Sequence, residues 1–149
     1  MENSKPLKRT DESATRLVIN TLNGKNAYGI NIDSIFKTKK HGYVLLEFLK
    51  CESKYVNGCQ SHPRRYWKKN WRKFVRLWEI AKKLDAKFIL VNYEEPALNS
   101  YANFRIMEVD MNVKPSEDRI VKTRDIVSCG KFEDFKKFYL ELNEDHTDM

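Results

Sequence analysis

The sequence predicts an α/β protein in which helices flank a mixed central sheet. Apolar, β-prone residues fill three runs, residues 28–36, 43–50 and 87–93, as expected for strands of a covered sheet. Between the second and third runs, residues 63–84 carry apolar side chains at the spacing of an amphipathic helix. Strands that alternate with helices in this order indicate an α/β architecture.

Capping and turn residues predict where the elements before this helix begin and end. Thr10 or Asp11 can cap a first helix, and Asn23-Gly24 ends it through the left-handed conformation that glycine tolerates. Residues 37–42 predict the turn of a hairpin between the first two strands.

After the hairpin, the polar segments 51–62 and 94–100 are expected to be loops. Residues 101–113 predict an additional strand, residues 126–128 a short strand, and residues 132–142 a C-terminal amphipathic helix.

The length of 149 residues fits one domain. We expect a disordered lead-in at residues 1–9, a single domain at 10–143 and an acidic tail at 144–149. The net charge of +7 points to an anionic partner, most commonly nucleic acid, although solubility alone is the alternative reading. There is no glycine-rich phosphate loop and no recognisable hydrolytic triad.

No apolar stretch approaches the roughly 18 residues of a membrane span, and the polar N-terminus does not resemble a signal peptide. We therefore expect no membrane partner and a cytoplasmic protein, in which the cysteines would be reduced thiols. A zinc site is an alternative reading of the cysteines, but their spacing matches no common zinc motif. Its ligands would be Cys51, Cys59, His62 and Cys129.

The helix at 63–84 has two different faces. Its apolar residues fall within one arc and are expected to pack on the sheet: Trp67, Trp71, Phe74, Val75, Trp78 and Ala81. Six cations fall on the opposite side: Arg65, Lys68, Lys69, Arg72, Lys73 and Arg76. No acid lies between Pro63 and Glu79 to offset them, so we expect this face to contact a phosphate backbone, with a merely solvated face as the alternative.

Two acids lie inside the apolar runs of the predicted hairpin. Asp33 ends the segment Gly29-Ile-Asn-Ile-Asp33, and Glu47 lies within Leu45-Leu-Glu-Phe-Leu-Lys50. A charge in such surroundings is costly unless a metal or a cation compensates it. Since the hairpin would bring the two carboxylates side by side, the pattern predicts a Mg²⁺ or Mn²⁺ site.

These segments resemble the motif of the PD-(D/E)XK nuclease superfamily, over roughly residues 11–93. The resemblance implies a restriction-endonuclease-like core of order α-β-β-α-β, here with an additional strand and a C-terminal helix. Glu12 matches the position of an extra acid in many members. Gln60 and Tyr66 faintly resemble the Gln-and-Tyr element of one branch.

The resemblance implies Mg²⁺-dependent hydrolysis of a nucleic-acid phosphodiester, with DNA expected rather than RNA. Glu12, Asp33 and Glu47 would be the metal ligands, and Asp33, Glu47 and Lys50 the catalytic residues. Cutting both strands of a duplex would require a homodimer or two events.

The chain departs from the motif at the lysine. In the family the lysine comes two residues after the acid, where this chain has Leu49. Lys50 comes one residue later, and on a regular strand its side chain would point to the face opposite to that of Glu47. Three explanations stay open: a bulge that turns Lys50 back, a cation supplied by Lys68 or Lys69, or a degenerate site that binds without cutting. Nuclease, inactive nucleic-acid-binding module and protein-interaction module are therefore the competing functions.

Overall fold

The computed structural model describes residues 12–147 and divides the chain into two compact units, residues 1–30 and 31–149. The first unit holds α1 (Ser13–Leu22), which ends as predicted, because Asn23 is left-handed (φ 47°) and its N–H donates to the carbonyl of Ile19. The predicted lead-in at residues 1–9 lies outside the described residues.

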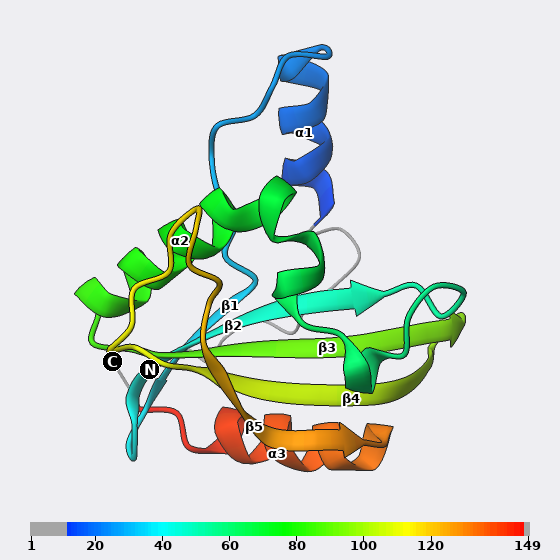
Figure 1. Cartoon of the computed structure of the whole chain (residues 1–149), viewed down its shortest axis with the longest axis vertical. Helices are drawn as coiled ribbons and strands as arrows, with labels where there is room; N and C mark the ends of the chain where they lie inside the picture. The colour runs from blue at the N-terminus through cyan, green and yellow to red at the C-terminus, as the bar shows by residue number, and fades with distance from the viewer. Residues whose placement is uncertain (1–11, 148–149) are drawn as a thin grey trace. The chain divides into compact units, whose positions relative to one another are not determined.

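The second unit contains a five-stranded mixed sheet in the order β1-β2-β3-β4-β5 (Figure 1). The strands are β1 (Ser34–Thr38), β2 (Gly42–Cys51), β3 (Lys87–Ala97), β4 (Ser100–Val109) and β5 (Thr123–Gly130). The pair β2 and β3 is parallel, and the other neighbouring pairs are antiparallel. This confirms the prediction of an α/β protein with a mixed sheet and a hairpin formed by the first two strands.

The parallel pair is connected by two short 3₁₀ helices and a long α-helix. These are η2 (Gly58–Gln60), η3 (Pro63–Tyr66) and α2 (Trp67–Lys83). The last two occupy the segment predicted as a single helix at 63–84, and η2 lies in the predicted loop at 51–62. The last helix, α3 (Phe132–Glu144), follows β5.

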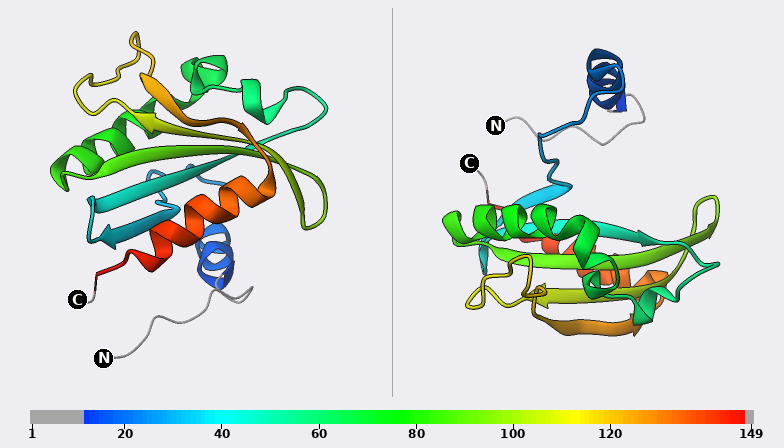
Figure 2. Two further views of the ribbon diagram at one scale, coloured as in Figure 1. Left: turned by 90° about the horizontal axis from the view of Figure 1, so that it is seen from below. Right: turned by 45° about the horizontal axis from the view of Figure 1, so that its top comes forward.

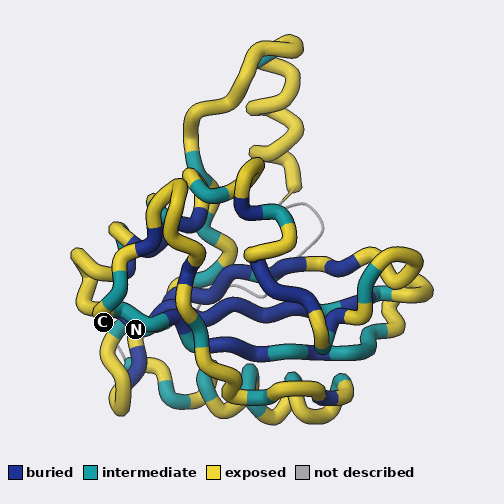
Figure 3. The backbone as a smooth tube through the Cα atoms, in the orientation of Figure 1, coloured by how far each residue is buried: buried dark blue, intermediate teal, exposed yellow. Residues whose placement is uncertain are grey.

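The two long helices cover opposite faces of the sheet (Figure 2). On one face α2 buries Trp67, Phe74, Leu77, Trp78 and Ala81. On the other, aromatic residues of α3 pack on a core of six strand residues: Val44, Leu46, Ile89, Val91, Phe104 and Ile106. Burial on both faces explains why the central strands are apolar almost throughout (Figure 3).

The first strand is shorter than predicted and begins at Ser34 instead of Tyr28. Its ladder with β2 stops where Ser34 pairs with Leu46. Just before this point the side chain of Asp33 accepts the N–H of Phe48 at 2.8 Å, a donor that a continuing β1 would use. The strand therefore ends because a side chain replaces the backbone acceptor.

The loop predicted at 94–100 is wrong, because β3 and β4 continue into a tight hairpin around Leu98 and Asn99. Asn99 supplies the positive φ (60°) that the turn needs. Pro96 is tolerated because the pairing is irregular between Glu94 and Ala97, so no ladder bond depends on a proline N–H.

The expectation of reduced cysteines is wrong for two of the three. A disulfide joins Cys59 in η2 to Cys129 in β5, while Cys51 is free and buried. The two cysteines are 70 residues apart and meet only because β5 crosses the sheet beside η2.

Part of the predicted acidic tail is ordered against β1. The N–H of Lys39 donates to the carbonyl of Asp145, and the N–H of Thr147 donates to that of Lys37. A bridge between Thr38 and His146 completes this pairing.

Candidate functional site

The hairpin brings Asp33 and Glu47 together. Ser34 pairs with Leu46 across the ladder, so the residues next to them, Asp33 and Glu47, lie opposite each other. The N–H of Phe48 holds the Asp33 carboxylate from the β2 side. The side-by-side arrangement predicted from the two apolar runs is therefore present.

Glu47 is almost fully buried, with 1% of its surface exposed, and it faces α2. The pKa of Glu47 is raised to about 7, chiefly by burial and then by a hydrogen bond with the Asp33 carboxyl, while Lys73 opposes both effects. Near neutral pH, Glu47 therefore carries a proton in part of the molecules, beside the Asp33 carboxyl. Such a pair is a ready site for a divalent cation, which would take the place of that proton.

The cation next to these acids comes from α2, not from β2. Lys73 forms an ion pair with Glu47, and its own side chain remains 44% exposed. It lies one helical turn after Lys69, on the helix whose Lys68 and Lys69 we considered as the source of the cation; among the described residues, neither of those two has an ion pair with Asp33 or Glu47. Its role beside Glu47 was missed because 26 residues of chain and a crossover separate the two.

Lys50, predicted as the catalytic lysine, lies away from the two acids. The register between β2 and β3 is continuous from Val44 to Cys51, so no bulge turns Lys50 toward Glu47. Its ammonium instead lies 3.7 Å from Glu95. Of the three explanations for the displaced lysine, the bulge is therefore wrong.

Tyr66, the last residue of η3, lies close to the site. Its half-buried hydroxyl has a raised pKa, because burial and the nearby Cys51 and Glu47 side chains all disfavour the charged form. Gln60, the other residue of the faint Gln-and-Tyr resemblance, is exposed at the end of η2.

The segment that leads from β2 to η3 is held by Glu94, a residue that the sequence analysis placed in a loop. Its buried carboxylate accepts hydrogen bonds from the N–H of Gly58 (2.6 Å), from Ser53 (2.7 Å) and from Asn103 (2.8 Å). Burial raises the pKa of Glu94, but these three donors outweigh it and leave the pKa below its usual value. Glu94 thus has a structural role: it fixes the segment of chain that leads to Tyr66 and α2.

The cationic face of α2 and η3 is exposed next to the acids. Among the described residues, Lys73 is the only one of the six predicted cations that has an ion pair. The guanidinium of Arg72 lies over the ring of Trp71 at 4.6 Å. The other members are Arg65, Lys68, Lys69 and Arg76, all exposed. Their charges are thus available to an anionic partner.

Metal ligands beyond this pair are not assembled in the part of the chain that the structure describes. Residues 12–147 contain no group of three or more His, Cys, Asp or Glu side chains that could hold a metal ion. Glu12, the third predicted ligand, belongs to the first unit, whereas Asp33 and Glu47 belong to the second. The alternative zinc site is excluded in this state, since its Cys59 and Cys129 are bonded to each other.

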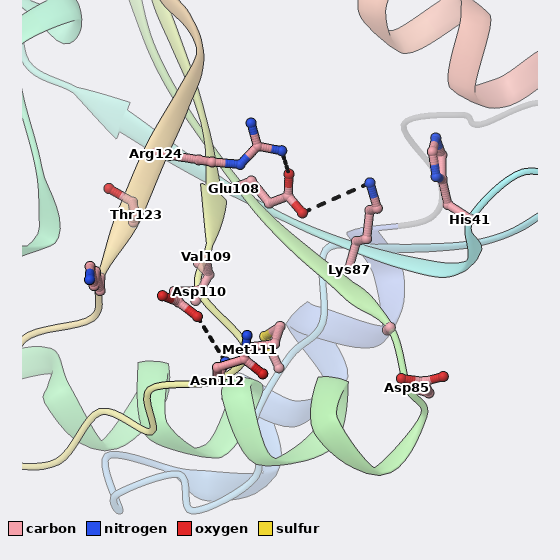
Figure 4. A pocket seen from close by; sticks show the side chains of 12 residues that line it. His41, Asp85, Lys87, Glu108, Val109, Asp110, Met111, Asn112, Thr123 and Arg124 are labelled. Atoms are coloured by element: carbon pink, nitrogen blue, oxygen red, sulfur yellow. Dashed lines mark hydrogen bonds and ion pairs between the residues drawn. The ribbon is translucent and has the colours of Figure 1, made fainter.

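A hollow of about 670 Å³ lies elsewhere, at the end of the sheet where β3 begins and β4 ends (Figure 4). Glu108 lies at its centre, 3.9 Å from Lys87 and paired also with Arg124. None of Asp33, Glu47 and Lys73 lines this hollow. Because its central acid is already paired with two cations, we do not take this hollow as the candidate functional site.

Comparisons with known proteins leave the family open. A scan against protein-family models found no matching family, and searches of curated proteins and of solved structures found no match. Within residues 12–147, no helix is both long enough and apolar enough to cross a membrane.

Proposed function

We propose that this protein is a small, metal-dependent nuclease of the PD-(D/E)XK kind, acting on DNA rather than RNA, with Lys73 in place of the family's lysine. The observation that carries the proposal is the contact of Asp33, Glu47 and Lys73 at the β1–β2 edge under α2. The element order α1-β1-β2-α2-β3 supports it, since it matches the α-β-β-α-β order of the superfamily core.

The residues present fit a divalent cation. Asp33 and Glu47 supply hard carboxylate oxygens of the kind that Mg²⁺ and Mn²⁺ prefer, and water would complete the coordination. Because the pKa of Glu47 lies near 7, its carboxyl can exchange a proton for a divalent cation near neutral pH. A bound Mg²⁺ would polarise the phosphate and lower the pKa of an attacking water.

The chain's own residues would position the substrate and offset its charge. Lys73 is held beside Glu47 yet is partly exposed, so its ammonium can turn toward a phosphate oxygen that carries developing negative charge. The remaining cations of α2 and η3 would hold the backbone on either side of the scissile bond, without reading sequence.

Cleavage of plasmid and linear DNA in Mg²⁺ or Mn²⁺ tests this proposal. Asp33→Asn, Glu47→Gln and Lys73→Met should each lower the rate at least about 100-fold, because each removes a group at the reacting centre. Lys87→Met is the matched control, since Lys87 pairs with Glu108 away from the two acids, and it should cleave within about threefold of wild type. Cleavage that survives Asp33→Asn or Glu47→Gln would refute this site.

A second candidate is a nucleic-acid-binding module that does not cut. The ion pair between Lys73 and Glu47 favours it, because that pair neutralises one of the two metal ligands. This alternative predicts salt-sensitive binding without turnover in either metal, and unaltered binding in Glu47→Gln. The cleavage assay therefore separates the two candidates directly.

A further inference from the structure

An aromatic hollow lies on the other face of the sheet, between the strand ends and α3. Its volume is about 370 Å³, and its lining is wholly aromatic: Phe48, Tyr93, Tyr101, Phe104, Phe132 and Phe135. Several of these rings are stacked or edge-on at centroid distances of 5.0–6.4 Å. Rings in such an array offer flat faces to a planar ligand.

This hollow adjoins the candidate site through Phe48. The ring of Phe48 lines the hollow, while its N–H donates to the Asp33 carboxylate at 2.8 Å. Burial raises the pKa of the Tyr93 hydroxyl, and the nearby charges of Glu95 and Asp33 raise it further. The hollow therefore lies beside Asp33 along the edge of β2, on the face of the sheet opposite to the Glu47 side chain.

Beyond Leu46, the edge of β2 between the two places carries the Asp33 side chain at the N–H of Phe48 and not a paired strand. β1 pairs with β2 only as far as Leu46, but β2 continues to Cys51. Among the described residues, no strand pairs with β2 on that side beyond Leu46. A flexible polymer at Asp33 and Glu47 can thus pass around this edge into the hollow, whereas the backbone of β1 blocks the edge nearer the turn.

Cations lie at the rim of the hollow. Lys136 lies over the ring of Phe132 at 5.4 Å, and Lys50, half-exposed, follows Phe48 by two residues on the same face of β2. Lys50 is partly offset by Glu95. An apolar floor with a basic rim suits a base attached to a phosphate backbone better than an uncharged apolar peptide.

We infer that the aromatic hollow holds one unpaired nucleobase of the strand whose phosphodiester lies at Asp33 and Glu47, so that the substrate is single-stranded or unpaired at that point. The inference rests on the proposed function. A base in a duplex is already stacked and paired, whereas an unpaired base can be turned out onto aromatic rings; such stacking, without reading of base edges, is how proteins hold single strands.

The test uses a single-stranded DNA oligonucleotide with one 2-aminopurine, and the same strand in a duplex. Binding to the full chain carrying Glu47→Gln, which blocks cleavage, should quench the 2-aminopurine in the single strand through stacking. Tyr101→Leu or Tyr93→Leu, added to that variant, should abolish the quenching and weaken single-strand binding about tenfold, within the range for one lost stacking contact. Tyr55→Leu, at an exposed loop position outside the hollow, is the control and should change neither.

The outcomes separate this inference from the proposed function. Equal quenching and affinity in the Tyr101, Tyr93 and Tyr55 variants would overturn the inference, as would a duplex that binds and is cut as well as the single strand. If the wild-type chain cleaves DNA in this case, the nuclease proposal still stands. If it never cleaves but quenching depends on Tyr101, base binding is supported and the nuclease chemistry is refuted.

Discussion

Replacing Glu47 by glutamine should remove a loss of stability that wild type undergoes as the pH rises to neutral. The buried Glu47 carboxyl has a pKa near 7, against 4.5 for the free side chain. The folded state therefore binds a proton more tightly than the unfolded state does, and this stabilisation is present at low pH and lost as the pH rises from about 4.5 through 7.

The size of the effect follows from the shift. A pKa difference of about 2.5 units corresponds to about 3 kcal/mol, at 1.36 kcal/mol per unit. Glutamine has no proton to lose, so Glu47→Gln avoids this pH-dependent loss. The difference in unfolding free energy between Glu47→Gln and wild type should thus grow by about 3 kcal/mol in favour of the variant between pH 4.5 and pH 8. Functional sites often contain a charged group that lowers the stability of the fold.

Urea denaturation in EDTA, measured at several pH values between 4.5 and 8, gives this difference directly. Glu79→Gln is the matched control, because Glu79 is an exposed acid on α2, and the same substitution there removes no buried carboxyl. Wild-type and Glu47→Gln curves that stay parallel across this pH range would refute the assignment of a buried, proton-holding carboxyl. A Glu47→Gln protein that is less stable at pH 8 than at pH 4.5, relative to wild type, would refute it as well.

Three further predictions concern the binding face and the supports of the site. Reversing Lys68, Lys69 and Arg72 to glutamate should weaken DNA binding and lower the slope of log affinity against log salt by about 2 to 3, measured by fluorescence anisotropy; an unchanged slope would eliminate the cationic face. Gly58→Ala should cost about 2–3 kcal/mol in urea denaturation, because an added Cβ would collide with the backbone carbonyl of Asn103, and an unaltered midpoint would contradict that contact. Cys59→Ser should lower the unfolding free energy by up to about 4 kcal/mol, since it removes a cross-link over 70 residues, and a thiol titration that finds three free cysteines in the native wild-type protein would contradict the disulfide.

The parts of the fold that depend on local pattern were predictable from the sequence. The β1–β2 hairpin follows from two apolar runs and a polar turn, and its register then places Asp33 beside Glu47 without further information. The burial of the α2 tryptophans follows from helical spacing, and Trp67 and Trp78 are indeed buried. The carboxylate pair of Asp33 and Glu47 could thus be predicted from the sequence alone.

Features that depend on contacts between distant segments could not be predicted in this way. Lys73 reaches Glu47 only because the crossover lays α2 over β2, and the helical wheel alone places it among the solvent-facing cations. From the sequence, Glu94 is predicted to lie in a loop. Its structural role depends on hydrogen bonds from Gly58, Ser53 and Asn103, which only the folded chain brings together. The meeting of Cys59 and Cys129 likewise requires the sheet order, which no spacing of cysteines encodes. The location of the protein in the cytoplasm stays a prediction.

The central claim is that Asp33 and Glu47 share a divalent cation. A crystal soaked in Mn²⁺ and measured at the manganese absorption edge tests it most directly. We expect an anomalous peak about 2.2 Å from a carboxylate oxygen of each residue, with the Lys73 ammonium moved off Glu47. An occupied ion pair between Lys73 and Glu47, with no peak between the two acids at saturating Mn²⁺, would contradict the claim.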